Sequence, residues 1–194
     1  MPFVPISDLL PRLADPAHLS QAQENWKLIA LALSKRGITD EWNHRGVCAT
    51  VAVETAHHFV PLREYGKPEY FKKMYWDNLR VRNMLGNIVE TDAADYCGRG
   101  FIQLTGRNNY ERAGAALNLP LLSQPKLLHE PGVSAEALAW FWASHGLPAI
   151  INQMPDYPAS QLRERLWKQV RRRVNGGENG LAVFLKDLSI LGVL

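Results

Sequence analysis

Hydrophobic and polar positions along the chain recur mainly with the period of an α-helix. Leu162, Leu166, Val170 and Val174 are spaced four residues apart, which places their side chains on one face of a helix. The alternation of apolar and polar residues that is typical of a strand is almost absent. The pattern therefore predicts a mainly α-helical protein.

Capping and turn residues divide this pattern into separate helices. Asp40, Ser134 and Ser160 are the expected N-terminal caps, because their side-chain oxygens can accept hydrogen bonds from free backbone N–H groups. The segment 138–142 is almost entirely apolar, so its helix is expected at the centre of the core. The predicted helices cover residues 15 to about 37, 40 to about 54, 108–117, 134 to about 142, 160–174 and 180 to about 191.

The stretch 61–95 differs from the rest of the chain. It is rich in proline, glycine and polar residues, and a short aromatic helix over 70–75 is the element expected within it. We interpret it as a smaller, irregular lobe that forms one wall of a cleft. The prediction is a single domain over 1–194, with a larger helical lobe at 1–60 and 96–194 and a smaller lobe at about 61–95.

Length and composition place the chain among ordinary globular proteins: it has 194 residues, of which 46% are hydrophobic and 21% charged. Cys48 and Cys97 are expected as buried free thiols, and a single bridge between them is the alternative. The N-terminus lacks the features of a secretory signal, and no window approaches about 18 apolar residues. We therefore expect synthesis in the cytoplasm and no stable insertion into a membrane.

Charge is mild overall but uneven along the chain. The formal net charge is +3, from 22 basic and 19 acidic residues. The basic side chains expected on the outer face of the helix 160–174 are Arg163, Arg165, Lys168, Arg171, Arg172 and Arg173. Such a face is either simply solvated or a binding surface for anionic envelope polymers. No nucleic-acid-binding module is visible.

Glycine and amide side chains gather in the segment 97–110. Glycine lets the backbone approach a ligand closely, and Gln103, Thr105 and Asn109 offer hydrogen-bond donors and acceptors beside that backbone. A purely structural turn would need the glycines but not the amides. The segment is therefore typical of a floor that binds an amino sugar.

A carboxyl group interrupts the apolar run that precedes this segment. Val47, Val51 and Glu54 share one helix face, so Glu54 points toward the core near the C-terminal end of its helix. Burial and the negative end of the helix dipole both favour the protonated form, which a general acid requires. The structural alternative is a buried glutamate that is paired with an arginine.

Hydrolysis of a glycosidic bond usually needs a second carboxyl group. Glu64 is the best candidate, because it follows the helix end and can face Glu54 across a cleft. The other candidates are Glu69, Glu90, Asp92 and Asp95. Tyr65 and Tyr96 are the preferred platforms for sugar rings.

Two adjacent histidines, His57 and His58, lie close to Glu54. A zinc motif on one helix would place its ligands on a single face, with histidines four residues apart. That spacing is missing, so the sequence predicts no metal site and no cofactor.

Four ordered motifs together resemble glycoside hydrolase family 19. They are Glu54-Thr55 with Phe59, the segment from Gly98 to Tyr110, Ala139-Trp140-Phe141-Trp142, and Val174-Asn175-Gly176-Gly177. The resemblance implies a mainly α, lysozyme-like, two-lobed fold with a substrate cleft between the lobes, and an inverting mechanism.

Site roles also follow from this resemblance. It implies that Glu54 is the general acid, that Glu64 is the base, and that Thr105 positions the attacking water. Gln103, Asn109 and Asn175 match sugar-binding positions of the family.

The resemblance is greatest to the lysozyme-like endolysins of phages. It implies a monomeric enzyme that cuts β-1,4 bonds of peptidoglycan and reaches the cell wall after release by a separate membrane-permeabilising protein. A chitinase acting on N-acetylglucosamine polymers is the first alternative, and a non-catalytic glycan-binding protein on the same fold is the second.

Overall fold

The computed structural model describes residues 3–156 and 161–194. Helices dominate these residues, as the sequence pattern predicts, and the two strands are short. In chain order the elements are α1 (Ile6–Leu13), η1 (Pro16–His18), α2 (Leu19–Lys35), α3 (Glu41–Glu54), β1 (Leu62–Arg63), α4 (Pro68–Phe71), η2 (Lys72–Trp76), α5 (Leu79–Leu85), α6 (Asp92–Asp95), β2 (Arg99–Gly100), α7 (Arg107–Leu117), η3 (Pro125–His129), α8 (Pro131–Ser144), α9 (Leu147–Ile151), η4 (Met154–Asp156), α10 (Gln161–Asn175) and α11 (Leu181–Ile190).

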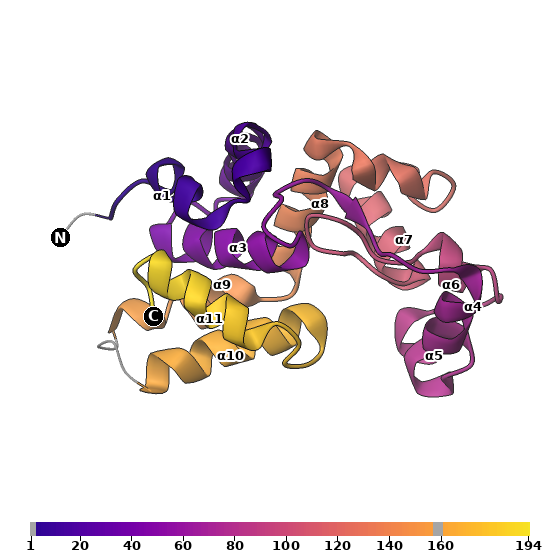
Figure 1. Cartoon of the computed structure of the whole chain (residues 1–194). Helices are drawn as coiled ribbons and strands as arrows, with labels where there is room; N and C mark the ends of the chain where they lie inside the picture. Colours follow the sequence, from indigo (N-terminus) through magenta and orange to yellow (C-terminus); the bar gives the residue numbers. More distant parts are fainter. Residues whose placement is uncertain (1–2, 157–160) are drawn as a thin grey trace.

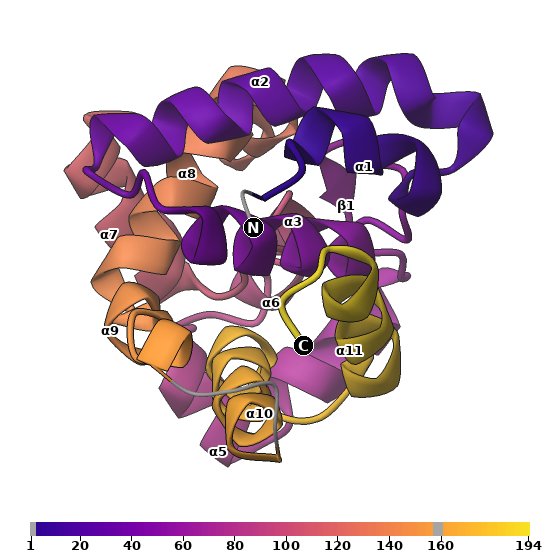
Figure 2. The same cartoon turned by 90° about the vertical axis from the view of Figure 1, so that its left-hand side faces the viewer.

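Helix α3 is buried along most of its length and organises the larger hydrophobic core. It begins after Asp40, whose side chain accepts a hydrogen bond from the backbone N–H of Asn43, as the sequence predicts. Helices α1, α9 and α11 contact it, and Figure 2 shows α3 surrounded by neighbouring helices. Trp142 of α8 donates its indole N–H to Asn43, at 2.9 Å, which ties α8 to α3. The end of α3, where Glu54 lies, is therefore held on a rigid support.

The elements α4, α5 and α6 gather at one end of the molecule, apart from α1, α3 and α11 (Figure 1). They enclose a small hydrophobic cluster of their own, built on Phe71, Ala93 and Cys97. Strands β1 and β2 pair antiparallel, with Leu62 opposite Gly100. This pair brings the segment that follows α3 beside the glycine-rich segment.

The structure differs from the predicted helices at several ends. Helix α8 begins at Pro131, three residues before the predicted cap Ser134, because proline suits the first position of a helix. Ser134 lies inside the helix, and its hydroxyl accepts a hydrogen bond from the backbone N–H of Phe101. The predicted cap Ser160 lies outside the described residues. Helices α1 and α9 were not predicted, and the stretch 61–95 is more helical than expected.

Both cysteines are free and buried, which confirms the prediction of free thiols. Burial is the main cause that raises the pKa of the Cys48 and Cys97 thiols, so both stay protonated and unreactive at neutral pH. Among the described helices, none has the length and apolar character needed to cross a membrane.

Candidate active site

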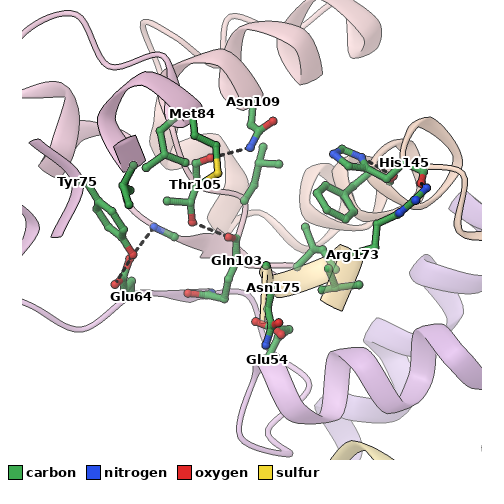
Figure 3. Close-up of a pocket in the computed structure, with 18 residues that line it drawn as sticks. Glu54, Glu64, Tyr75, Met84, Gln103, Thr105, Asn109, His145, Arg173 and Asn175 are labelled. Carbon is green, nitrogen blue, oxygen red and sulfur yellow. Dashed lines mark hydrogen bonds between the residues drawn. The ribbon is translucent and has the colours of Figure 1, made fainter. Parts of the chain in front are cut away.

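A cleft of about 590 Å³ brings together segments that are far apart in the sequence (Figure 3). One wall comes from the segments around Glu64 and α5, and the opposite wall comes from the ends of α8 and α10. The floor is the glycine- and amide-rich segment. The lining residues are Glu54, Glu64, Tyr75, Val81, Met84, Leu85, Gly98, Ile102, Gln103, Leu104, Thr105, Asn109, Phe141, His145, Arg173, Val174, Asn175 and Gly176.

Glu54 is the last residue of α3, and its side chain is 13% exposed. Its Oε1 forms an ion pair with Nη1 of Arg171, whose side chain is only 4% exposed. The remaining nitrogens of Arg171 donate to the backbone oxygen of Asn179, at 2.9 and 2.7 Å. Arg171 therefore fixes the carboxyl group in place at the edge of the cleft.

This ion pair bears on two statements of the sequence analysis. The structural alternative for Glu54, a buried carboxylate paired with an arginine, is present. The expected place of Arg171 on the outward basic face was wrong, because its side chain is buried and pairs with Glu54 at the end of α3.

Glu64 follows β1 and receives hydrogen bonds from two neutral donors. The hydroxyl of Tyr75 donates to both carboxylate oxygens, at 2.8 and 3.0 Å, and the backbone N–H of Gly98 donates to Oε2, at 3.0 Å. Burial, and next the charge of Glu64, raise the pKa of the Tyr75 phenol, which keeps it a hydrogen-bond donor. These donors hold the carboxyl group of Glu64 in one orientation at the cleft wall.

Gly98 allows this close arrangement because it has no side chain. A Cβ atom at this position would lie 2.8 Å from Oε1 of Gln103 and 3.3 Å from Glu64. The glycine therefore lets the strand segment, the amide and the carboxylate meet at one point.

Thr105, Gln103 and Asn109 are linked through the backbone of the floor. The hydroxyl of Thr105 donates to the backbone oxygen of Gln103, at 2.8 Å, and the amide nitrogen of Asn109 donates to the backbone oxygen of Thr105, at 2.8 Å. The amide nitrogen of Gln103 donates to the backbone oxygens of Leu62 and Gly100, both at 3.0 Å. In the described part of the chain, the side-chain oxygens of Gln103 and Asn109 receive no hydrogen bond, so they are available to a ligand.

Asn175 lines the cleft, but its side chain also closes the turn after α10. Its amide nitrogen donates to the backbone oxygen of Asn179, at 2.8 Å, and its side-chain oxygen accepts from the backbone N–H of Gly177, at 2.9 Å. Asn179 is the residue whose carbonyl also holds Arg171. Asn175 therefore shapes the wall beside Glu54.

The two tyrosines expected as sugar platforms lie elsewhere. Tyr96 is 7% exposed, packs against Tyr110 in the core, and donates its hydroxyl to the backbone oxygen of Leu122. Tyr65 is 97% exposed and is not among the residues that line the cleft. Burial leaves the ring of Tyr96 without a face for a sugar, whereas the platform role of the exposed Tyr65 stays a prediction.

The sequence interpretation missed Tyr75, Met84, His145 and Arg173 in the cleft walls. His145 stacks on Phe141, with ring centroids 3.7 Å apart, and Arg173 donates to the His145 backbone oxygen at 3.1 Å. Burial is the largest cause that lowers the pKa of His145, so its ring is mainly neutral near pH 7. Of these four residues, only Tyr75 could have been found from the sequence, because it ends the aromatic stretch 70–75.

The other acidic candidates for the base lie outside the cleft. Asp92 pairs with Arg107, at 3.2 Å, and its carboxylate also accepts backbone hydrogen bonds. Glu69, Glu90 and Asp95 line a different hollow beside α4 and α6. Within the described residues, Glu54 and Glu64 are thus the two carboxyl groups that line the cleft. Among the same residues, neither of them belongs to a cluster of three side chains that could hold a metal ion.

Comparisons with known proteins relate part of the chain to a family. Residues 83–151 match the family described as chitinase class I, glycoside hydrolase family 19. Acidic endochitinase Q of Nicotiana tabacum is 35% identical over 102 residues, which are 46% of this chain and 40% of that protein. Chitinase 11 of Oryza sativa subsp. japonica is 36% identical over 112 residues, which are 53% of this chain and 42% of that protein.

The similarity of fold extends further than the similarity of sequence. The crystal structure of chitinase C from Streptomyces griseus HUT6037 covers 96% of this chain with a TM-score of 0.55, at 21% sequence identity and over 74% of its own length. The predicted mainly helical, lysozyme-like fold is confirmed. The sequence alignments, by contrast, span only about two fifths of those two curated relatives.

Proposed function

We propose that this relative of glycoside hydrolase family 19 hydrolyses β-1,4 bonds in polymers of N-acetylglucosamine. The observation that carries the proposal is that Glu54 and Glu64 reach the same cleft from separate walls, with Gln103 and Thr105 on the floor of that cleft. Two carboxyl groups on either side of a cleft are what glycosidic hydrolysis requires.

Glu64 and Thr105 are suited to activate water. The proton of the Thr105 hydroxyl is directed to the backbone oxygen of Gln103, so this hydroxyl offers its lone pairs to a water molecule. A water that donates one hydrogen to Thr105 and the other to Glu64 keeps a lone pair for the anomeric carbon. Glu64 then accepts the proton as the general base, and the attack inverts the configuration of that carbon.

Glu54 is suited to the acid role through its second carboxyl oxygen. Arg171 occupies Oε1, and in the described part of the chain Oε2 has no hydrogen-bond partner and can carry the proton to the leaving oxygen.

The free amide oxygens of Gln103 and Asn109 are suited to bind the sugar. Their amide nitrogens donate to backbone oxygens, so each side chain is held in one orientation. An oxygen held in this way can accept a hydrogen bond from an N-acetyl N–H or a hydroxyl group. This arrangement supports an amino-sugar polymer as the substrate.

Peptidoglycan is the second candidate, and the charge of the cleft rim favours it. Arg173 lines the wall beside Asn175, and the other basic residues of α10 continue away from the cleft. Peptidoglycan carries carboxylate groups that such a rim would attract, whereas chitin is uncharged. If peptidoglycan is the substrate, an endolysin role, with release by a separate membrane-permeabilising protein, follows as the biological context.

The test measures hydrolysis of N-acetylglucosamine hexamers and of purified peptidoglycan by the native protein, Glu54→Gln and Glu64→Gln. We expect each substitution to lower kcat by about 10²- to 10⁴-fold, as is usual when a general acid or base is removed. Glu69→Gln is the matched control, because Glu69 is an exposed carboxylate outside the cleft. Circular dichroism checks that each variant is folded.

Each outcome decides one part of the proposal. Cleavage of the hexamer with an α-anomeric product supports an inverting chitinase, and cleavage of peptidoglycan alone supports the endolysin. Full activity of Glu64→Gln would remove the base assignment. A folded native protein that binds both polymers and cleaves neither would show that the cleft is a glycan-binding site.

A further inference from the structure

Three potential metal ligands that do not line the cleft meet beside the loop that follows α3. Asp15 precedes η1, His18 ends it, and His58 lies four residues after Glu54. One donor atom from each of the three lies within 4.8 Å of the others. In the described part of the chain, no other cluster of three or more histidine, cysteine, aspartate or glutamate side chains meets this distance. None of the three side chains lines the cleft.

The donor atoms face one another without hydrogen bonding. Oδ2 of Asp15 lies 3.8 Å from Nδ1 of His18 and 3.7 Å from Nε2 of His58, both too long for a hydrogen bond. Oδ1 of Asp15 is already used, because it accepts from the backbone N–H of Ala17 at 2.8 Å. Nδ1 of His18 is buried and has no hydrogen-bond partner. A buried nitrogen of this kind calls for an explanation, and a bound ion supplies one.

The two imidazole rings are stacked, with centroids 4.3 Å apart and an angle of 22° between their planes. The stacking holds the ring of His18, from η1, against the ring of His58, from the loop after α3, and both rings lie beside the carboxylate of Asp15.

We propose that Asp15, His18 and His58 bind one divalent transition-metal ion of the zinc class. Donor atoms about 2.0–2.1 Å from a tetrahedral zinc lie about 3.3–3.4 Å apart, so the two separations from Asp15 need to close by about 0.4 Å, and the two histidine nitrogens, which lie within 4.8 Å of each other, also need to approach. Two nitrogens and one carboxylate oxygen form a ligand set that zinc accepts. The side chains are 33%, 39% and 36% exposed for His18, Asp15 and His58, so the ion can enter and water can fill the fourth position.

The ion would fasten η1 to the loop that follows Glu54. The backbone N–H of Asp15 already donates to the backbone oxygen of His57, at 2.9 Å, so the two segments are adjacent. Ala56, His57 and Phe59 in this loop have φ angles of 50°, 64° and 55°, a region that is unfavourable for residues other than glycine. A metal that holds His58 would oppose opening of this strained loop. Its role is to stabilise the loop and not to take part in catalysis.

Sequence spacing did not reveal this group, because its members come from positions 15, 18 and 58. The sequence prediction rested only on the adjacent pair His57 and His58, which lacks the spacing of a zinc motif. Folding brings η1 against the end of α3 and assembles the three ligands.

The test uses protein without a histidine tag and titrates it with ZnCl₂ by isothermal calorimetry. We expect one ion per chain, and we expect Asp15→Asn and His58→Gln each to weaken binding by at least about tenfold. Asparagine at position 15 keeps an acceptor for the Ala17 N–H, so the turn is preserved. Glu24→Gln removes the same charge from an exposed position on α2 and serves as the control with unchanged binding.

Thermal unfolding gives a second, independent readout. With free zinc at a hundred times Kd, we expect Tm to rise by about 5–10 °C in the native protein and to return to its starting value when a chelator is added. Mg²⁺ at the same concentration should leave Tm unchanged, because it disfavours imidazole ligands. Zinc binding of equal strength in Asp15→Asn and His58→Gln would overturn the proposal, and so would the absence of a saturable site in the folded native protein.

Discussion

At the scale of single residues, the two carboxyl groups of the cleft are stabilised by partners of different kinds. Glu54 has a full positive charge beside it on Arg171, whereas Glu64 has the neutral donors Tyr75 and Gly98. A buried ion pair is rigid and costly to break, while hydrogen bonds from neutral groups are weaker and can rearrange. This difference fits a fixed residue on one wall and a proton-accepting residue on the other.

The first prediction at this scale concerns the hydroxyl of Tyr75, which holds Glu64. Tyr75→Phe removes both hydrogen bonds to Glu64 but keeps the ring that stacks on Phe71. A hydrogen bond to a charged group contributes about 1.5–3 kcal/mol, so we expect kcat on the amino-sugar hexamer to fall about 10- to 100-fold. Tyr96→Phe is the control and should keep its kcat, because Tyr96 lies in the core. Equal kcat values in the native protein and Tyr75→Phe would contradict this role.

The protonation of His145 gives a prediction for pH. Burial lowers the pKa of His145 in the folded protein below the value of about 6.5 in the unfolded chain. The unfolded chain therefore binds more protons between these two pKa values, and stability falls as the pH decreases below about 6.5. We expect Tm to drop less between pH 7.5 and 5.5 in His145→Gln than in the native protein. The same drop in both proteins would show that His145 does not contribute.

Cleft residues that belong to a sequence motif are easier to predict from the sequence than residues that reach the cleft wall from other segments. Glu54, Glu64, Gln103, Thr105 and Asn109 all lie in the cleft, because hydrogen-bonding residues and glycines that serve one ligand leave a dense local signal. Their proposed roles remain predictions. The partner of Glu54 could not be found in this way, since Arg171 lies more than a hundred residues away and looks like the surface arginines beside it.

At the scale of the elements, caps and glycines predict helix ends well where they act locally. Asp40 caps α3, and Gly180 precedes α11, as predicted. Ser134 misled the prediction because its hydroxyl bonds to a distant backbone group and not to its own helix. The helical content of the stretch 61–95 was underestimated, because these short helices are stabilised by a small shared cluster that no periodic pattern reveals.

The prediction at this scale concerns Ser134, which connects α8 to the residue that follows β2. Its hydroxyl accepts the backbone N–H of Phe101 at 2.7 Å, and both residues are buried. Ser134→Ala leaves that N–H without a partner, so we expect stability to fall by about 1–3 kcal/mol. Denaturant unfolding measures the change. Ser144→Ala is the control on the same helix, at an exposed position, and should change stability by less than about 0.5 kcal/mol.

At the scale of the whole molecule, only some segments of the site lie in the part of the chain that matches the family model. The matched residues 83–151 include the floor and His145, but neither Glu54 nor Glu64. The carboxyl groups are placed by the fold, whose similarity covers 96% of the chain. A function that needs both carboxyl groups therefore depends on the packing of the whole chain around α3.

Arg45 on α3 ties the two ends of the described chain to this central helix. Its side chain is 1% exposed, and its guanidinium donates to the backbone oxygens of Val4 and Leu191 and pairs with Glu41. Arg45→Met leaves both carbonyls without this partner, so we expect stability to fall by about 3–5 kcal/mol. For a chain of this size, that loss lowers Tm by about 6–20 °C.

Calorimetry of the variant, with Arg165→Met as the exposed control on α10, checks this expectation. The control should stay within about 0.5 kcal/mol of the native protein, because an exposed charge contributes little to stability. A loss in Arg45→Met no larger than in the control would show that the chain ends are held without Arg45. A large loss that also lowers activity would show that the position of Glu54 depends on the anchoring of α3 at both ends of the chain.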